Sequence, residues 1–244
     1  MLAEVSRRLG ERVDWRPFGH GSSNRLLAGT LRGQRLLLRI DAPPERAFGV
    51  RRDTERRLLE AIDGRRWAPR VVATAPGWLV MHRHQGRGGR ERATVDALLR
   101  AVADWQSRRW SLPATDYDRL WRDYRNALPA ARHGAVDRLV RAVAALPPRP
   151  ATLVHHDLHP GNLLRTRRSL RVIDWEYGGL GNPWFDAAAL QRRFGVGATA
   201  IGRLPAFTGV PRDELVRGLA LAASIVGGLD ALWYEVRGEP ADGL

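Results

Sequence analysis

The stretch "HHDLHPGNLL", residues 155–164, decides how the rest of the sequence is interpreted. It places three histidines and an aspartate within five positions, followed by a Pro-Gly turn, an asparagine and two leucines. Taken alone, it could be a histidine-rich metal site, a catalytic loop built around Asp157, or a polar turn that leads into a strand. The neighbouring segments are needed to choose among the three.

A second polar motif follows closely. The run "LRVID" (170–174) predicts a short strand that pairs with "NLL" (162–164) across the polar connection "RTRRS". This hairpin would return Asp174 to the neighbourhood of Asn162, so that two oxygen ligands face one point. Oxygen donors suit Mg²⁺, which usually takes few protein ligands beside nucleotide phosphates. Asp157 would then orient a hydroxyl group and accept its proton, the division of roles that phosphoryl transfer requires.

The other two interpretations are weaker. His155, His156 and His159 would serve zinc best on a helix, and the Pro160-Gly161 pair that follows makes a helix there unfavourable. Asp157 alone could be a turn carboxylate that satisfies backbone donors. The presence of Asn162 and Asp174 in the same segment favours catalysis instead.

The hydrophobic pattern divides the chain into two parts. As far as His84, short apolar runs read as strands, with one helix over "RRDTERRLLEAI" (51–62). Two runs, "NRLLAGTL" (24–31) and "QRLLLRI" (34–40), predict a hairpin, and two more lie around Val71 and Leu79. From about residue 86 the pattern lengthens into helices, over 92–110, over 133–146, and over most of 184–234. Between the two parts lies "GRGG" (86–89), where we expect a hinge.

The order "H-x-D-x-x-x-x-N" followed by "I-D" resembles the catalytic and metal-binding loops of the protein-kinase-like superfamily. More narrowly, "HHDLHPGNLL" with "VIDWEYGGLGNPWFD" (172–186) is similar to the aminoglycoside phosphotransferase and choline kinase family. The phrase "IDWEY" is closest to its choline kinase and bacterial thiamine kinase members. This resemblance implies a two-lobed α+β, protein-kinase-like fold, with an antiparallel-sheet nucleotide-binding lobe (1–85) and a larger helical catalytic and substrate-binding lobe (86–244).

The resemblance also implies roles in the first lobe. The loop in "FGHGSSNRLL" (18–27) would cover the nucleotide phosphates through Gly19, Gly21, Ser22, Ser23 and Asn24. Arg39 would be the cationic anchor, where many relatives carry lysine, and its permanent charge can grip phosphate oxygens. Glu55 matches the helix glutamate that pairs with the anchor, with Glu60 as a competing carboxylate.

The implied activity is an ATP- and Mg²⁺-dependent kinase of small alcohols, with Asp157 as base, His155 bracing the loop, and Asn162 and Asp174 on the metal. Asp186 is expected to cap a helix and steady the catalytic loop. Thiamine is the first choice of acceptor, before choline or ethanolamine, and then aminoglycosides or amino sugars. Candidate substrate contacts are Trp175, Glu176, Tyr177, Trp233 and Glu235. A pseudokinase that binds nucleotide without turnover is the competing hypothesis.

Composition narrows the class of protein. The chain of 244 residues has a net charge of +14, and all 40 basic residues are arginines spread along the sequence. Such spreading favours a compositional bias over a dedicated nucleic-acid surface. There is no cysteine, and no run approaches the roughly 18 apolar residues of a membrane-spanning helix. With no secretory pattern near residue 1, we predict a cytoplasmic protein without a membrane or specific nucleic-acid partner. Oligomeric state stays open.

Overall fold

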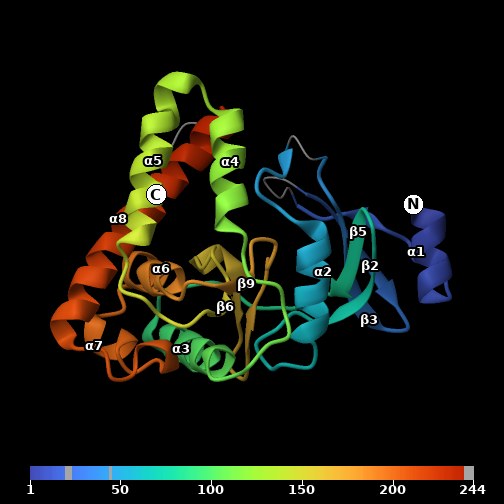
Figure 1. The fold of residues 1–244 in the computed structure, drawn as a ribbon. Coiled ribbons are helices and arrows are strands. Elements are labelled where there is room, and N and C mark those ends of the chain that lie inside the picture. The colour runs from blue at the N-terminus through green and yellow to red at the C-terminus, as the bar shows by residue number, and fades with distance from the viewer. Residues whose placement is uncertain (20–23, 44–45, 239–244) are drawn as a thin grey trace.

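The structure is a computed structural model that describes residues 1–19, 24–43 and 46–238. Figure 1 shows two lobes: a blue N-terminal lobe built on a sheet, and a C-terminal lobe of helices that runs from green to red. This arrangement confirms the predicted α+β class with two lobes. The expected hinge (86–89) falls between the last strand of the sheet and the first long helix of the second lobe. The division into two domains stays a prediction.

The N-terminal lobe is a sheet of five strands in the order β1-β2-β3-β5-β4, and every neighbouring pair is antiparallel. Its elements are β1 (Arg16–Pro17), β2 (Arg25–Leu31), β3 (Gln34–Ile40), β4 (Val71–Ala75), β5 (Trp78–His82), α1 (Leu2–Leu9) and α2 (Arg52–Ala61). The predicted hairpin is β2-β3, closed at Arg32 and Gly33, both of which have positive φ. Helix α1 was not predicted from the sequence.

Successive side chains of β3 point to opposite faces of the sheet. Leu36 and Leu38 are buried in a cluster with Val5 of α1. Because successive side chains of a strand point to opposite faces, Arg39 faces away from α1 and reaches Glu55 on α2. The register of β3 therefore decides that Arg39 faces helix α2.

The C-terminal lobe is mainly helical. It contains α3 (Arg92–Gln106), α4 (Tyr117–Ala127), α5 (Ala130–Ala144), α6 (Trp184–Phe194), α7 (Ala198–Ile201) and α8 (Arg212–Arg237), with the 3₁₀ turns η2 (Pro160–Asn162) and η3 (Pro205–Phe207). Helix α4 is absent from the sequence prediction, although Asp116 caps it by accepting the N–H of Arg119 at 2.9 Å. Its buried Trp121 and Tyr124 form one narrow apolar face, which aspartates and arginines obscure in the sequence.

Two small antiparallel sheets hold the segment that the sequence singled out. Strand β6 (Thr152–Val154) pairs with β9 (Gly179–Gly181), and β7 (Leu163–Arg165) pairs with β8 (Leu170–Val172). The second pair confirms the hairpin predicted between "NLL" and "LRVID". Strand β6 leads into His155, β7 follows Asn162 and β8 leads towards Asp174, so these strand ends place the polar residues together.

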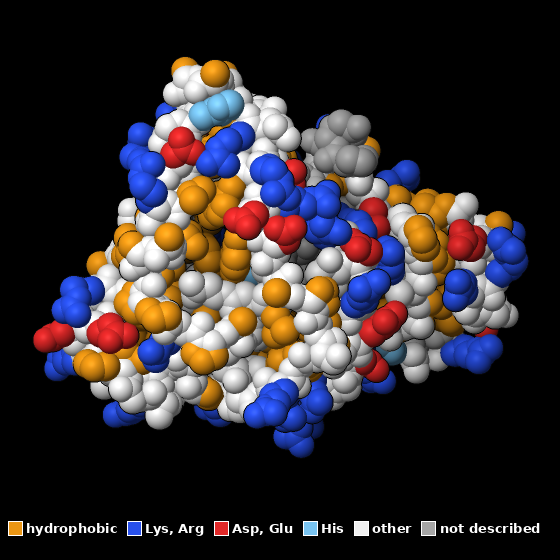
Figure 2. All heavy atoms as spheres, viewed as in Figure 1, with side chains coloured by type: hydrophobic (Ala, Val, Ile, Leu, Met, Phe, Trp, Pro, Cys, Tyr) orange, Lys and Arg blue, Asp and Glu red, His pale blue; other side chains and the backbone are white. Residues whose placement is uncertain are grey.

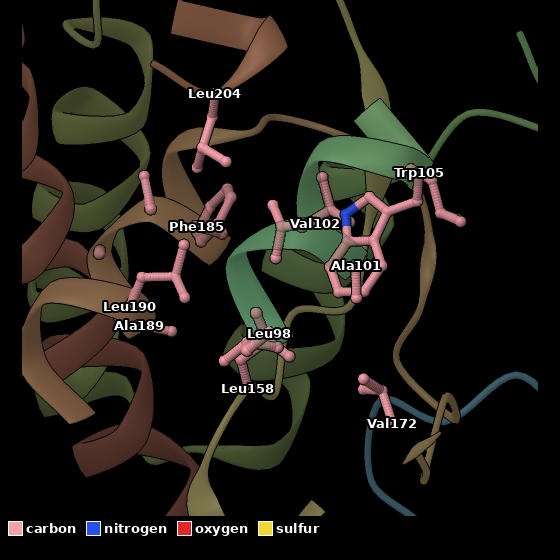
Figure 3. Packing of buried hydrophobic residues seen from close by; sticks show 14 of the residues in the cluster. Leu98, Ala101, Val102, Trp105, Leu158, Val172, Phe185, Ala189, Leu190 and Leu204 are labelled. Atoms are coloured by element: carbon pink, nitrogen blue, oxygen red, sulfur yellow. The ribbon is translucent and has the colours of Figure 1, made fainter. Parts of the chain in front are cut away.

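The core of the C-terminal lobe lies between α3, α6 and the small sheets. Figure 3 shows Leu98, Val102 and Trp105 of α3 in this cluster together with Phe185 and Leu190 of α6. The indole of Trp175 joins the same core, with its ring centre 5.3 Å from that of Trp105. This packing gives the segment after Asp174 a rigid support.

Residues 86–89, where the sequence predicts a hinge, lie against the loop 155–164 and the strand after it. A side-chain carbon at Gly88 would overlap the carbonyl oxygen of Pro160, and one at Gly86 would lie 2.7 Å from the backbone of Leu164. Two backbone hydrogen bonds join Arg87 to Arg165. Only glycine therefore fits at position 88, because the obstacle is backbone rather than a flexible side chain.

Helix α8 is long and apolar enough, by length and composition, to cross a membrane. Its buried residues, among them Leu219, Ala222 and Ile225, belong instead to the hydrophobic core of the lobe. Helices α6 and α8 pack against each other, and Figure 1 shows α8 running along the lobe beside α5 and α6. These buried residues of α8 contribute to packing within the fold.

Candidate active site

Asp157, Asn162 and Asp174 lie together on the wall of one cavity of about 1300 Å³. The amide nitrogen Nδ2 of Asn162 donates to the backbone oxygen of Asp157 at 2.9 Å and to its Oδ2 at 3.0 Å. The N–H of Ile173 donates to the backbone oxygen of Asn162 at 2.9 Å. The loop and the strand before Asp174 are therefore joined by hydrogen bonds, and the three predicted residues share one site.

His155 and Asp186 hold the backbone of the loop. Nε2 of His155 donates to the carbonyl oxygen of Ile173 at 2.9 Å, and Nδ1 accepts the N–H of Asp157 at 3.3 Å. Burial lowers the pKa of His155 to about 4, so its ring is neutral at pH 7. The carboxylate of Asp186 accepts the backbone N–H groups of His155 and His156 at 3.0 to 3.2 Å. Asp186 steadies the loop, as expected, from the first turn of α6 rather than from its cap.

The three histidines of the loop turn to different partners. His155 contacts Ile173, His156 contacts the hydroxyl of Tyr117 at 2.8 Å, and Nδ1 of His159 accepts the N–H of Gly161 at 3.1 Å. Nε2 of His159 also lies 3.6 Å from Oδ2 of Asp157. Each ring is used to shape or line the loop.

Asp174 is open to the cavity on one side and crowded by protein on the others. Its φ of +63° is uncommon for a residue with a side chain. Burial and the charge of Glu176 raise the pKa of Asp174 to about 7, against the opposing charge of Arg39. The charge of Arg39 compensates this carboxylate only in part. Nδ2 of Asn162 is used by Asp157, which leaves the amide Oδ1. This pair of oxygen donors fits Mg²⁺.

Arg39 and Glu55 form a buried bidentate ion pair. Nη1 and Nη2 of Arg39 donate to the two carboxylate oxygens of Glu55 at 2.6 and 2.7 Å, and Nε donates to Asp41 at 3.2 Å. Burial alone would lower the pKa of Arg39, but the contact with Glu55 outweighs it and the net direction is upward. Glu60 is exposed, so Glu55 is the carboxylate that the structure brings to the anchor.

Arg52, which sequence reasoning missed, joins several predicted residues. Nη1 of Arg52 lies 2.9 Å from both Glu55 and Glu176, and Nη2 donates to Oδ1 of Asn24 at 2.8 Å. Nδ2 of Asn24 also donates to Glu176 at 3.3 Å. A single guanidinium group thus connects α2, the end of the predicted phosphate loop and the segment after Asp174. Arg52 lies one turn before Glu55 on α2. This spacing was the signal in the sequence from which its role could have been inferred.

The predicted phosphate loop is only partly described. Gly19 has a φ of +64°, and Asn24 sits in the network around Arg52. Gly21, Ser22 and Ser23 lie outside the described residues. The structure therefore brings one end of the loop, at Asn24, to the site.

Aromatic side chains line part of the cavity. The rings of Phe48 and Tyr124 lie 4.9 Å apart, Tyr177 donates its hydroxyl proton to the backbone oxygen of Phe48, and Nε1 of Trp233 donates to the Tyr177 oxygen at 3.1 Å. The guanidinium of Arg237 lies 4.5 Å from the centre of the Trp233 ring, so one face of this indole already holds a cation.

The charge of the cavity differs from that of the whole chain. Among the described residues, seven carboxylates line it against five guanidinium groups; the carboxylates are Asp53, Asp116, Asp123, Asp157, Asp174, Glu176 and Asp230. Figure 2 shows acidic and basic side chains side by side between α4 and the N-terminal lobe, while arginines are spread over the visible face. The cavity is thus acidic within a strongly basic chain.

The predicted substrate contacts separate into groups. Tyr177, Trp233 and Glu176 line the cavity, whereas Trp175 is buried in the core. Glu235 lies outside the lining and pairs with Arg132 at 2.7 Å. Sequence reasoning missed Asp230, which lies three residues before Trp233 on the same face of α8 and pairs with Arg193 at 3.0 Å.

The sequence resembles a known protein family over most of its length. The profile described as "Phosphotransferase enzyme family" matches residues 14–219. A thiamine kinase of Escherichia coli is 43% identical over 65 residues, which make up 25% of this chain and 24% of that enzyme. The match therefore spans about a quarter of the length of this curated relative.

Solved structures resemble nearly the whole chain. A choline/ethanolamine kinase family protein from Mesorhizobium loti has a TM-score of 0.67 at 20% identity, over 97% of this chain and 86% of the other. Choline kinase LicA from Streptococcus pneumoniae has a TM-score of 0.72 at 16% identity, over 98% and 90%. A complex of LicA with AMP has a TM-score of 0.69 at 16% identity, over 98% and 91%. These values show a common fold.

Proposed function

Because this chain belongs to the phosphotransferase enzyme family and has a two-lobed, protein-kinase-like fold, we propose that it is an ATP- and Mg²⁺-dependent kinase of a small cationic alcohol. The observation that carries the proposal is the meeting of Asp157, Asn162 and Asp174 on one cavity wall. Thiamine is the first candidate acceptor. The partial match to thiamine kinase supports this choice.

Asp157 is the proposed base. Burial would raise the pKa of Asp157, but the contact with Nε2 of His159 and neighbouring charge such as that of Arg193 outweigh burial and lower it, so the carboxylate is ionised at pH 7. Asn162 holds Oδ2 of Asp157, which leaves Oδ1 to accept the proton of the acceptor hydroxyl. The hydroxyl oxygen attacks the γ-phosphorus of ATP, the bond from that phosphorus to ADP breaks, and the proton moves to Asp157.

Asn162 and Asp174 would hold Mg²⁺. When bound, the metal supplies positive charge that neutralises the phosphate oxygens. Arg39 adds a second positive charge from the opposite lobe, and Glu55 keeps its guanidinium in place. Asn24 brings the end of the phosphate loop towards the same region through Arg52 and Glu176.

The lining of the cavity supports a cationic acceptor. Its carboxylates outnumber its guanidinium groups among the described residues. Phe48, Tyr124 and Tyr177 offer aromatic surface, on which a charged or aromatic ring is held favourably. Choline or ethanolamine is the second candidate, and aminoglycosides or amino sugars are the third. We predict that the enzyme acts in the cytoplasm on a dissolved alcohol.

The test is Mg²⁺-dependent ATP consumption against a panel of thiamine, choline, ethanolamine, amino sugars and aminoglycosides. We expect turnover with one acceptor class, and a fall in kcat of about 10²- to 10⁴-fold in Asp157→Asn. Asp213→Asn, at an exposed position of α8, is the matched control. ATP binding without turnover on any acceptor would identify a pseudokinase. Turnover that Asp157→Asn leaves intact would rule out Asp157 as the base.

A nucleic-acid partner can be tested in the same preparation. Binding to a random DNA duplex should be weak and should fall steeply with salt, because spread arginines give non-specific attraction only. Tight binding at physiological salt would contradict this expectation.

A further inference from the structure

The residue just before the proposed base has a backbone conformation that its side chain disfavours. His156 has a φ of +65°, in the left-handed region that residues larger than glycine enter at a cost in free energy. The direction in which the chain leaves His156 sets where Asp157 points. Something in the fold must therefore hold His156 in this conformation.

Two contacts hold His156 from opposite sides. Its backbone N–H donates to Oδ1 of Asp186 at 3.1 Å. Its ring nitrogen Nε2 lies 2.8 Å from the hydroxyl of Tyr117, at the first residue of α4. The Tyr117 oxygen accepts the backbone N–H of Asn182 at 2.9 Å. In the tautomer with the ring proton on Nδ1, the Tyr117 hydroxyl donates to Nε2 of His156.

The rings around this contact are closely packed. Tyr117 stacks on Phe185 with ring centres 5.4 Å apart, and His156 is tilted against the same ring at 5.4 Å. A side-chain carbon at Gly181 would lie 2.6 Å from the Tyr117 hydroxyl and 2.8 Å from the His156 ring. Because Tyr117, His156 and Phe185 line the same cavity as Asp157, the cluster joins the start of α4 to the catalytic loop.

We propose that Tyr117 and His156 are positioning residues, whose hydrogen bond keeps His156 in the left-handed conformation and thereby directs Asp157 towards the acceptor hydroxyl. The inference rests on the proposed role of Asp157 as base. Neither side chain transfers the proton itself. A displacement of the base by about 1 Å can cost as much as 10²-fold in rate, so the contact acts on kcat rather than on nucleotide binding.

Three substitutions of His156 separate positioning from packing. Glycine enters the left-handed region freely, whereas alanine resists it but leaves a smaller void. Positioning therefore predicts a higher kcat for His156→Gly than for His156→Ala, and packing predicts the reverse order. Asparagine tolerates the left-handed region and its Oδ1 can accept from Tyr117, so His156→Asn should retain the most activity of the three. We expect His156→Ala to lose about 10-fold or more in kcat, with KM for ATP unchanged.

Tyr117→Phe tests the contact without touching the loop, and stays informative if a His156 variant fails to fold. It should lower kcat and leave the affinity for ATP, measured by calorimetry, unchanged. His133→Ala is the control for loss of a hydrogen-bonded histidine elsewhere, since His133 contacts backbone oxygens of Arg125 and Leu128 in the α4–α5 region. A kcat of His156→Ala equal to or above that of His156→Gly, or an unchanged kcat in Tyr117→Phe, would overturn the inference.

A second readout does not depend on turnover. In spectra of ¹⁵N-histidine-labelled protein, the His156 ring should carry its proton on Nδ1, and Tyr117→Phe should shift the Nε2 resonance. An Nε2 resonance that Tyr117→Phe leaves unchanged would contradict the proposed contact. Asp157→Asn in the same activity assay distinguishes a failure of the proposed function from a failure of the positioning role alone. If it keeps full kcat, the proposed function fails, and if it loses kcat while the order of the His156 variants is reversed, only the positioning role fails.

Discussion

Arg52 donates to Glu176 across 2.9 Å and so joins helix α2 of the N-terminal lobe to the segment that follows Asp174. The same nitrogen lies 2.9 Å from Glu55, the partner of Arg39. One guanidinium group therefore lies between the two carboxylates that flank the proposed phosphate site. Its loss would leave both of them with less compensating charge.

We expect Arg52→Gln to lower the free energy of unfolding by about 2 kcal/mol or more, because Glu55 and Glu176 are only 2% and 8% exposed. Arg51→Gln on the same helix end is the control. Arg51 pairs with Asp53 at 3.6 Å, and both side chains are exposed. Such a pair contributes less than about 1 kcal/mol to stability. Urea unfolding measures both, and equal losses in the two variants would contradict the buried role of Arg52.

Gly88→Ala should destabilise the protein by about 2 to 3 kcal/mol or more, because the added carbon meets the backbone oxygen of Pro160. Gly134→Ala provides a control of opposite sign. Gly134 lies inside α5, and an added carbon there meets only Nη1 of Arg138 at 3.8 Å, so alanine should stabilise by about 0.5 to 1 kcal/mol. Thermal unfolding of the two variants measures both changes in stability. A neutral Gly88→Ala would mean that residues 86–89 can move away from the loop 155–164.

Asp186 predicts a pH dependence of stability. Burial raises the pKa of Asp186 to about 7 in the folded protein, although backbone N–H groups of His155 and His156 oppose it, and the unfolded value is about 3.9. The folded state therefore keeps a proton that the unfolded state loses between about pH 4 and 7. The resulting contribution to stability is full below pH 4 and is lost as the pH rises to about 7.

Asp186→Asn removes this titration. Its free energy of unfolding relative to the natural protein should rise with pH by up to about 1.4 kcal/mol per unit between pH 4 and 7, and then stay constant. His155 titrates in both proteins with the opposite sign, because its lowered pKa of about 4 costs stability as the pH falls below about 6.5. Denaturant unfolding at several pH values gives the difference, with Asp213→Asn, at an exposed position of α8, as the control. A flat profile for Asp186→Asn would rule out the raised pKa.

Asp230 and Glu235 make a matched pair for acceptor binding on one helix. Asp230 lines the cavity beside Arg193, whereas Glu235 lies outside it on Arg132. Asp230→Asn should raise KM for a cationic acceptor about 10-fold, since it removes a carboxylate and leaves Arg193 to repel the cation. Glu235→Gln should change the same KM by less than about 2-fold. Equal effects on the acceptor would restore a role for Glu235, and an effect of Asp230→Asn on ATP alone would exclude it from acceptor binding.

The sequence predicted the elements whose patterns are local. The β2-β3 hairpin, α2 and the β7-β8 hairpin all follow from apolar spacing and turn residues. Strand β9 was missed, because three residues of "GLG" carry no strand pattern until β6 lies beside them. Helix α4 was missed because only one narrow face is apolar.

At the site, motif spacing identified Asp157, Asn162 and Asp174, but not the residues that hold them. Arg52 and Tyr117 come from distant segments, and in a chain with 40 arginines a single Arg carries no signal of its own. The separation of Glu235 from Asp230 depends on which face of α8 meets the cavity, and this is set by packing against α6. Side-chain direction on a long helix is thus decided by tertiary contacts.

The chain is basic and its cavity is acidic. The electrostatic field of the protein therefore acts differently on the two substrates of the proposed reaction. A chain of +14 attracts ATP from a distance and repels a cationic alcohol until it enters the acidic cavity. Dissolved salt screens the long-range field within about 8 to 10 Å and leaves close contacts in the cavity much less affected. Raising the ionic strength should therefore slow the capture of ATP while it speeds the entry of the alcohol.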